Sequence, residues 1–165
     1  MTRVQPAARG FWLMKTEPHT FSYDDLHAAP GHTTPWDGVR NYQVRNMLRD
    51  DFRLGDQVFI YHSSCQMPAI VGVGVIVREG YPDLSALDIN SPYFDDRAAL
   101  KGESPWVCVD VKALGRFDRQ IALQDLRLDP ELAGMHLLRK GSRLSVQPVE
   151  AAAWRHILSM AELRL

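Results

Sequence analysis

The stretch from Trp36 to Tyr42, with the sequence WDGVRNY, carries the residues best suited to contact a ligand. Its two aromatic side chains bracket an arginine and an asparagine close to one glycine. An ordinary connection turns the backbone with Gly, Pro, Asn, Asp or Ser and has little use for two large aromatics. The same composition also fits core packing, in which Trp36 and Tyr42 fill the interior while Arg40 lies on the surface. On this stretch alone, the two interpretations are equally supported.

A second polar group, Lys15-Thr16-Glu17, follows the apolar run that begins at Phe11. An ammonium, a hydroxyl and a carboxylate at the end of a strand could form a polar wall for the edge of a base or an amide. Local sequence alone favours an exposed ion pair of little energetic value. A catalytic role would require a lowered pKa on Lys15 to activate Thr16. Alternation along a strand argues against this role, because it turns Thr16 away from its two neighbours.

His62 and Ser63 end another apolar run. Adjacent residues on a strand point to opposite faces, so these two do not form a nucleophile and its base. His62 and Cys65 have a loose spacing for zinc, but the remaining histidines supply no second pair of ligands at metal spacing. The sequence therefore predicts neither a metal site nor a cofactor.

Two further segments offer side chains to a site. Tyr93 lies between Gly80 and Ser104, which we expect to be a long irregular stretch, and loops of that length tend to be functional. Tyr93 could cover a pocket, or it could anchor the loop to the core. The segment from Arg143 to Gln147 alternates polar and apolar residues and predicts a half-buried strand with one polar face.

The elements that must position these residues follow from periodicity. Gly72 and Gly74 alternate within one predicted strand, which indicates a bulge, a tight bend or a close backbone approach. Several strands far apart in sequence, with helices between and after them, favour an α+β domain built on a curved sheet or small barrel. We expect strands over residues 11–15, 56–62, 69–77, 106–111 and 143–147, and helices beginning at Ser22 and over 42–51, 123–128, 130–135 and 150–162.

The amino-acid composition limits the number of domains and the kinds of partner that the protein can bind. The 165 residues are 45% hydrophobic, which predicts a single domain over residues 11–165 after a flexible N-terminal tail, residues 1–10. With 19 basic and 20 acidic residues the formal charge is -1. The chain as a whole is therefore not strongly cationic, as a protein that binds a nucleic-acid duplex through its overall charge would be. Any contact with nucleic-acid backbone needs a local patch, for which the candidates are Arg45, Arg49, Arg139 and Lys140.

Cysteine content and hydropathy bear on the compartment. Two cysteines are too few for a disulfide framework. We also find no apolar run long enough for a signal peptide or a membrane span. These features lead us to expect a cytoplasmic protein with no membrane partner, while the oligomeric state is left open.

Six blocks in a fixed order resemble the EVE domain family, which includes the thymocyte nuclear protein group. The blocks are residues 11–18, 36–42, 61–63, 81–83, 91–93 and 143–149, and the match runs from about residue 11 to 162. The resemblance implies a PUA-like fold, a small and strongly curved β-barrel with flanking helices. It also implies binding of a modified base, in DNA or RNA, in an aromatic-lined pocket. By motif position, the pocket residues would be Lys15, Thr16, Glu17, Trp36, Val39, Arg40, Asn41, Tyr42, His62, Ser63, Tyr93, Arg143, Ser145 and Gln147.

Two departures from the family pattern affect this assignment. Thr16 stands where serine is common, which adds a methyl group, and Ser64 stands where asparagine is common, which removes an amide. The favoured function is a non-catalytic reader of methylated or hydroxymethylated cytosine, or of methylated adenine. The alternative is a nucleobase-directed amidohydrolase of the ASCH type using Lys15, Thr16 and Glu17, since some related ASCH proteins use those residue types on acylated cytidine. A purely structural or protein-interaction domain ranks third.

Overall fold

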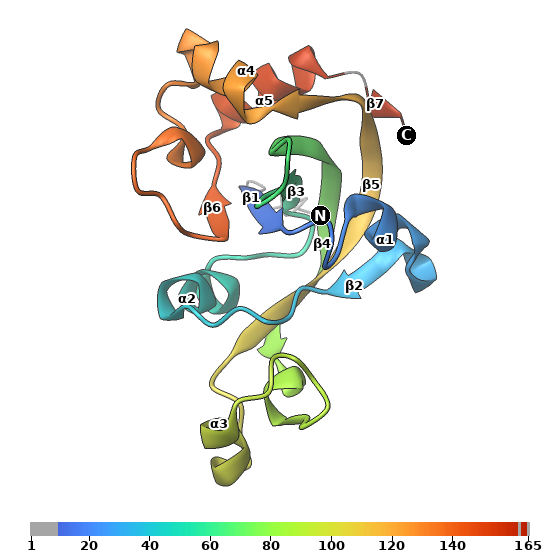
Figure 1. Ribbon diagram of the computed structural model, residues 1–165, viewed down its shortest axis with the longest axis vertical. Coiled ribbons are helices and arrows are strands. Elements are labelled where there is room, and N and C mark those ends of the chain that lie inside the picture. The colour runs from blue at the N-terminus through green and yellow to red at the C-terminus, as the bar shows by residue number, and fades with distance from the viewer. Residues whose placement is uncertain (1–9, 162, 165) are drawn as a thin grey trace, which may run out of the picture.

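A strongly curved sheet with helices on both of its faces forms the body of the protein (Figure 1). The computed structural model describes residues 10–161 and 163–164. The predicted flexible tail lies outside the described residues, apart from Gly10. The strands are β1 (Phe11–Thr16), β2 (Thr33–Pro35), β3 (Gln57–His62), β4 (Ala69–Pro82), β5 (Val107–Ala122), β6 (Val146–Pro148) and β7 (Leu163–Arg164).

The strands follow the order β2-β5-β4-β3-β1-β6, with β7 paired to β5. β1 and β3 are parallel, and the other ladders between described strands are antiparallel. Within residues 10–161 no ladder joins β2 to β6, the two ends of this order, so the sheet curves without closing. The predicted α+β fold is confirmed, as an open curved sheet.

Side-chain alternation along β1 and β3 builds a core on each face of the sheet. Trp12 and Met14 of β1 lie in one apolar cluster, while Leu13 between them lies in the other. Both faces of this parallel pair are therefore buried, which explains why the two strands read as nearly continuous apolar runs. On the second face, Trp154 stacks on Phe59 of β3 with ring centroids 3.8 Å apart.

The curvature arises in the two long strands, β4 and β5. Their pairing shifts register at four points, two of which involve Gly72 or Gly74. A Cβ on Gly72 would lie 2.7 Å from the carbonyl oxygen of Gly115 and 2.7 Å from the ring of Tyr23. The predicted bulge and close approach are confirmed at Gly72, where any side chain would push β4 and β5 apart.

Local capping signals place the first two helices. The Ser22 hydroxyl accepts a hydrogen bond from the Asp25 backbone, and the Asp25 carboxylate accepts one from the Ser22 backbone. Asn41 caps the next helix through its side-chain oxygen. The α-helices are α1 (Tyr23–Ala28), α2 (Tyr42–Asp50), α3 (Asp96–Lys101), α4 (Leu123–Leu128) and α5 (Ala151–Met160). The 3-10 helices are η1 (Pro30–His32), η2 (Leu84–Leu87), η3 (Pro130–Leu132) and η4 (His136–Leu138).

The stretch between Gly80 and Ser104 is not irregular, contrary to the prediction from sequence. It contains the end of β4, then η2 and α3, and extends away from the rest of the sheet (Figure 1). A small apolar cluster of Ala86, Ala98 and Trp106 holds it together. Helices of four and six residues are too short to display a helical period, so periodicity could not reveal them.

Candidate functional site

A cavity of about 610 Å³ opens where β1 ends and the chain leaves β2. This volume falls within the range of roughly 300–1,000 Å³ that is usual for small-molecule sites. Three of its walls carry aromatic rings, and charged side chains stand among them. The lining residues are Lys15, Thr16, Glu17, Thr20, Phe21, Thr34, Pro35, Trp36, Asp37, Pro92 and Tyr93.

Trp36 lines the cavity and also packs in the hydrophobic core. Its side chain is only 8% exposed and belongs to the apolar cluster that includes Val39. Its backbone N–H donates to the carbonyl oxygen of Val109 at 2.7 Å, which extends the pairing of β2 with β5. The ring of Phe21 meets it edge to face, with centroids 6.4 Å apart. The cavity wall at Trp36 is therefore fixed by packing before any ligand enters.

Lys15, Thr16 and Glu17 all line the same cavity. The alternation argument predicted that Thr16 faces away, but β1 ends at Thr16 and the chain then turns, so strand geometry does not govern Glu17. The Thr16 hydroxyl donates to the carbonyl oxygen of Phe21 at 2.6 Å. Partial burial lowers the pKa of the Lys15 ammonium.

Tyr93 lines the cavity and lies directly against Gly38. A Cβ on Gly38 would lie 2.5 Å from the Tyr93 ring, and the φ of Gly38 is +81°. Both the backbone conformation and the close contact therefore require glycine at this position. Burial raises the pKa of the Tyr93 phenol, and the nearby Asp37 carboxylate raises it further.

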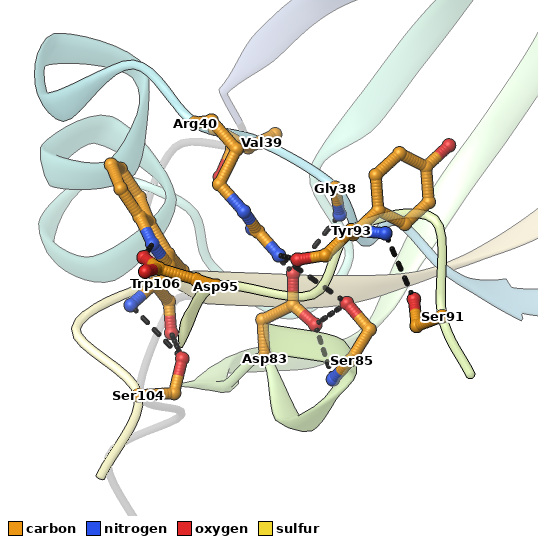
Figure 2. A network of polar contacts seen from close by, with 10 residues as sticks. All are labelled: Gly38, Val39, Arg40, Asp83, Ser85, Ser91, Tyr93, Asp95, Ser104 and Trp106. Atoms are coloured by element: carbon orange, nitrogen blue, oxygen red, sulfur yellow. Dashed lines mark hydrogen bonds and ion pairs between the residues drawn. The ribbon is translucent and has the colours of Figure 1, made fainter. Parts of the chain in front are cut away.

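A partly buried ion pair anchors the segment that carries Tyr93. The Arg40 guanidinium donates to Asp83 at 3.0 Å and to the carbonyl oxygen of Tyr93 at 2.6 Å. Figure 2 shows the Arg40 side chain directed at Asp83, with the Trp106 ring on one side and Tyr93 on the other. The guanidinium carbon lies 5.3 Å from the centroid of the Trp106 ring. Arg40 thus braces the cavity from behind.

Asp83 is the acceptor at the centre of this network. Only 1% of the residue is exposed, and burial alone would raise the pKa of its carboxyl. Hydrogen bonds from Ser85, Gly38 and Arg40 outweigh burial and hold that pKa below its ordinary value. The carboxylate therefore stays ionised and ties the segment of Gly38 and Arg40 to the start of η2.

The other predicted residues of the WDGVRNY stretch lie outside the cavity lining. Val39 is buried in the core. The Asn41 side chain accepts from the backbone N–H of Val44 as the cap of α2. Tyr42 is exposed and packs against Trp106, with ring centroids 4.7 Å apart.

His62 and Ser63 adjoin the cavity from the end of β3 without lining it. The Nε2 atom of His62 accepts a hydrogen bond from the backbone N–H of Tyr23 at 3.1 Å, and so holds the start of α1. Burial and the charge of Arg116 lower the pKa of His62. The Ser63 backbone donates to the carbonyl oxygen of Thr16 at 2.9 Å, which fixes the end of β1.

The predicted strand over residues 143–147 is wrong in its boundaries and in its polar face. β6 spans Val146–Pro148, and Gln147 is buried, with its amide donating to Ser142 and to the Leu144 carbonyl. Pairing with Leu13 of β1 directs Gln147 inward. Arg143 is exposed, and Ser145 reaches the site through its carbonyl oxygen, which accepts from the Lys15 backbone at 2.8 Å.

The four residues predicted to contact the nucleic-acid backbone fall into two groups. On α2, Arg45 lies over the Tyr42 ring and bonds Asn46, while Arg49 pairs with Asp50 at 2.8 Å. Arg139 and Lys140 lie in the exposed loop between η4 and β6 and form no ion pair with a described residue. Arg139 also contacts His136 at 3.4 Å, so Lys140 is the residue of the four that is freer than Arg49 to meet a phosphate.

Sequence reasoning missed six residues of the lining: Thr20, Phe21, Thr34, Pro35, Asp37 and Pro92. Asp37 could have been found, because it stands inside the WDGVRNY stretch. Thr34 and Pro35 belong to the short strand β2, whereas Thr20, Phe21 and Pro92 lie in turns or bends. Asp83 was also missed as the partner of Arg40, since 43 residues separate the two.

The described residues contain neither a cluster suited to a metal ion nor a helix suited to a membrane. No group of three or more His, Cys, Asp or Glu side chains among them is arranged to hold a metal ion. In the same part of the chain, no helix has the length and apolar character needed to cross a bilayer.

Comparison with known proteins identifies the family. Residues 10–160 match the EVE domain. Thymocyte nuclear protein 1 of Rattus norvegicus is 40% identical over 170 residues, which cover 92% of this chain and 74% of that protein. A solved structure from Pseudomonas syringae is 45% identical with a TM-score of 0.84, covering 91% of this chain and 98% of its own.

A human structure adds a bound partner to the comparison. Human THYN1 protein, solved in complex with DNA containing 5-methylcytosine, is 38% identical with a TM-score of 0.83. The alignment covers 92% of this chain and 96% of the human one. The family match spans nearly all of the described residues, and these neighbours share the α+β architecture. The chain therefore belongs to the EVE domain family.

Proposed function

We propose that this protein is a non-catalytic reader of a modified nucleobase, which it binds in the cavity between Trp36 and Tyr93. The observation that carries the proposal is a cavity of about 610 Å³ with aromatic walls, in a chain similar to a protein solved with 5-methylcytosine DNA. Phe21 and Trp36 offer fixed faces, and Tyr93 offers a cover. Methylated or hydroxymethylated cytosine and methylated adenine are the candidate bases.

The energetics call for more than one kind of contact. A base stacked on an aromatic ring gains roughly 1–3 kcal/mol, and flipping a base from a duplex costs a few kcal/mol. One stack therefore nearly cancels one flip. Hydrogen bonds inside the cavity and phosphate contacts from the loop that carries Arg139 and Lys140 would supply the rest. One methyl group discriminates by about 1–3 kcal/mol, so we expect modest selectivity over the unmodified base.

Tryptophan fluorescence tests the proposal. The wild-type chain is titrated with duplexes that carry one 5-methylcytosine, 5-hydroxymethylcytosine, N6-methyladenine or the corresponding unmodified base. We expect a change in fluorescence and tighter binding for at least one modified duplex, with a Trp36→Phe variant reporting how much of the signal arises in the cavity. Equal affinity for all duplexes, abolished by added salt, would contradict the proposal.

A second candidate function, a nucleobase-directed amidohydrolase, has one observation in its favour. Lys15, Thr16 and Glu17 line one cavity, and burial lowers the pKa of Lys15, as activation of a hydroxyl would require. Against it, the Thr16 hydroxyl already donates to the Phe21 carbonyl. Turnover of acylated cytidine by the wild-type chain, lost in Lys15→Ala, would establish the enzyme. No turnover in the wild-type chain would eliminate it.

A further inference from the structure

The carboxylate of Asp37 lies in the cavity wall, where no other described side chain pairs with it. It lines the cavity, and its side chain forms no hydrogen bond or ion pair with another described residue. Two other carboxylates near the site already have partners: Asp83 pairs with Arg40, and Glu17, which also lines the cavity, has His19 at 3.3 Å. Asp37 is exposed, and within the protein its carboxylate interacts with its own backbone N–H and with the nearby Arg40 charge, so it is accessible to a ligand in the cavity.

The cavity wall holds this carboxylate together with the Tyr93 ring, because both residues line the same cavity. Partial desolvation by the cavity wall and the neighbouring Asp83 raise the pKa of Asp37, while the Arg40 charge opposes them. After burial, Asp37 is the largest cause of the raised pKa of Tyr93. A base packed against Tyr93 would therefore bring its edge close to the Asp37 oxygens.

Hydrogen-bond chemistry then restricts which bases fit. An ionised carboxylate only accepts hydrogen bonds. Cytosine offers an amine at C4, whereas thymine and uracil place a carbonyl oxygen at the same position. An amine would donate to Asp37, but a carbonyl would set two acceptors against each other and leave both without a donor.

We propose that Asp37 makes the cavity selective for a pyrimidine with an exocyclic amine over one with a carbonyl at the same ring position. This inference rests on the proposed function and names the class of base that the same site accepts. It also assigns the amine and the methyl group to different parts of the cavity. Asp37 would read the amine, and the aromatic walls would meet the methyl group.

The test uses four duplexes that differ only in the target base, which lies opposite an abasic site so that no base pair has to open. The four bases are 5-methylcytosine, thymine, cytosine and uracil. Thymine carries the same methyl group as 5-methylcytosine, so that pair isolates the amine, as does the pair of cytosine and uracil. Comparing 5-methylcytosine with cytosine isolates the methyl group. Dissociation constants are measured by fluorescence for wild type, Asp37→Asn and Asp51→Asn.

We expect wild type to prefer each amine-bearing base over its carbonyl counterpart by about tenfold or more. In Asp37→Asn the ratio should fall toward one, because an amide can donate to the carbonyl as well as accept from the amine. Asp51→Asn removes the same charge from an exposed site outside the cavity and should keep the wild-type ratio. Thermal unfolding verifies that both variants are folded.

The outcomes separate the two proposals. An unchanged amine ratio in folded Asp37→Asn, including an equal loss of affinity for all four duplexes, would overturn the role of Asp37. Absence of amine selectivity in wild type would also overturn it. Equal affinity of wild type for 5-methylcytosine and cytosine, and for the other modified and unmodified pairs, would instead count against the proposed function.

Discussion

Arg40 and Asp83 form an ion pair of 3.0 Å that joins the strand-to-helix connection beside Trp36 to the start of η2. The side chain of Asp83 is 2% exposed and that of Arg40 is 26% exposed. The same guanidinium holds the carbonyl of Tyr93. The pair therefore holds the segment whose Tyr93 ring lines the cavity, although neither charged group lines the cavity itself.

Removing this carboxylate should destabilise the protein and loosen the site. Asp83→Ala leaves the Arg40 charge half-buried without its partner, and we expect a loss of about 3 kcal/mol in the free energy of unfolding. Urea denaturation measures this loss, and oligonucleotide titration should show weaker binding. Asp50→Ala removes an exposed partner of Arg49 and should leave the free energy of unfolding nearly unchanged. Equal behaviour of the two variants would show that the buried pair has no special role.

A methyl group on Gly38 should act mainly on the cavity. Its Cβ would lie 2.5 Å from the Tyr93 ring, so Gly38→Ala should displace that ring and weaken base binding by about 1–3 kcal/mol. Gly102→Ala is the matched control, because Gly102 also has a positive φ of +67° but has nothing within 4 Å of the added atom. That control should cost roughly 1 kcal/mol of stability through backbone strain alone and should bind normally. Normal binding by Gly38→Ala would refute the role of Tyr93 as a cover.

Two histidines should give opposite dependences of stability on pH. Burial and Arg116 lower the pKa of His62 below 6.5, so its contribution is present above pH 6.5 and is lost as the pH falls through the folded pKa. The hydrogen bond to Asp129 raises the pKa of His156 above 6.5, so its contribution is present below pH 6.5 and is lost as the pH rises through the folded pKa.

Urea denaturation from pH 5 to pH 8 measures both effects. Relative to wild type, His62→Gln should lose less stability on acidification, and its amide oxygen can still accept from the Tyr23 backbone. His156→Gln should be less stable than wild type at low pH, and this difference in the free energy of unfolding should shrink as the pH rises. Parallel pH profiles for wild type and both variants would contradict the assigned shifts.

Lys140 should contribute to affinity through phosphate alone. Lys140→Ala should weaken binding equally for modified and unmodified duplexes and reduce the slope of log K against log salt by about one. Arg49→Ala should change the slope less, because Arg49 is already paired with Asp50. A Lys140→Ala variant that altered the preference for a modified base would place this residue at the base instead.

The local features were predictable because their causes are local. Ser22 caps a helix through an acidic residue three positions later, and the uninterrupted apolar run of β1 predicted a strand that proved to be buried on both faces. Trp36 was identified as a wall of the site from composition and family resemblance, and it does line the cavity.

By itself, then, the sequence determined the family, the fold class and the stretch of chain on which the site is built. Only the tertiary structure decided which side chains of that stretch face the cavity. Asn41 was predicted to contact the base and instead caps α2, whereas Asp37 was not selected and lies in the wall. The physical reason is that a side chain's direction in a loop depends on partners distant in sequence. Gly38 and Arg40 are oriented by Asp83, more than forty residues away, while Asp37 beside them lines the cavity.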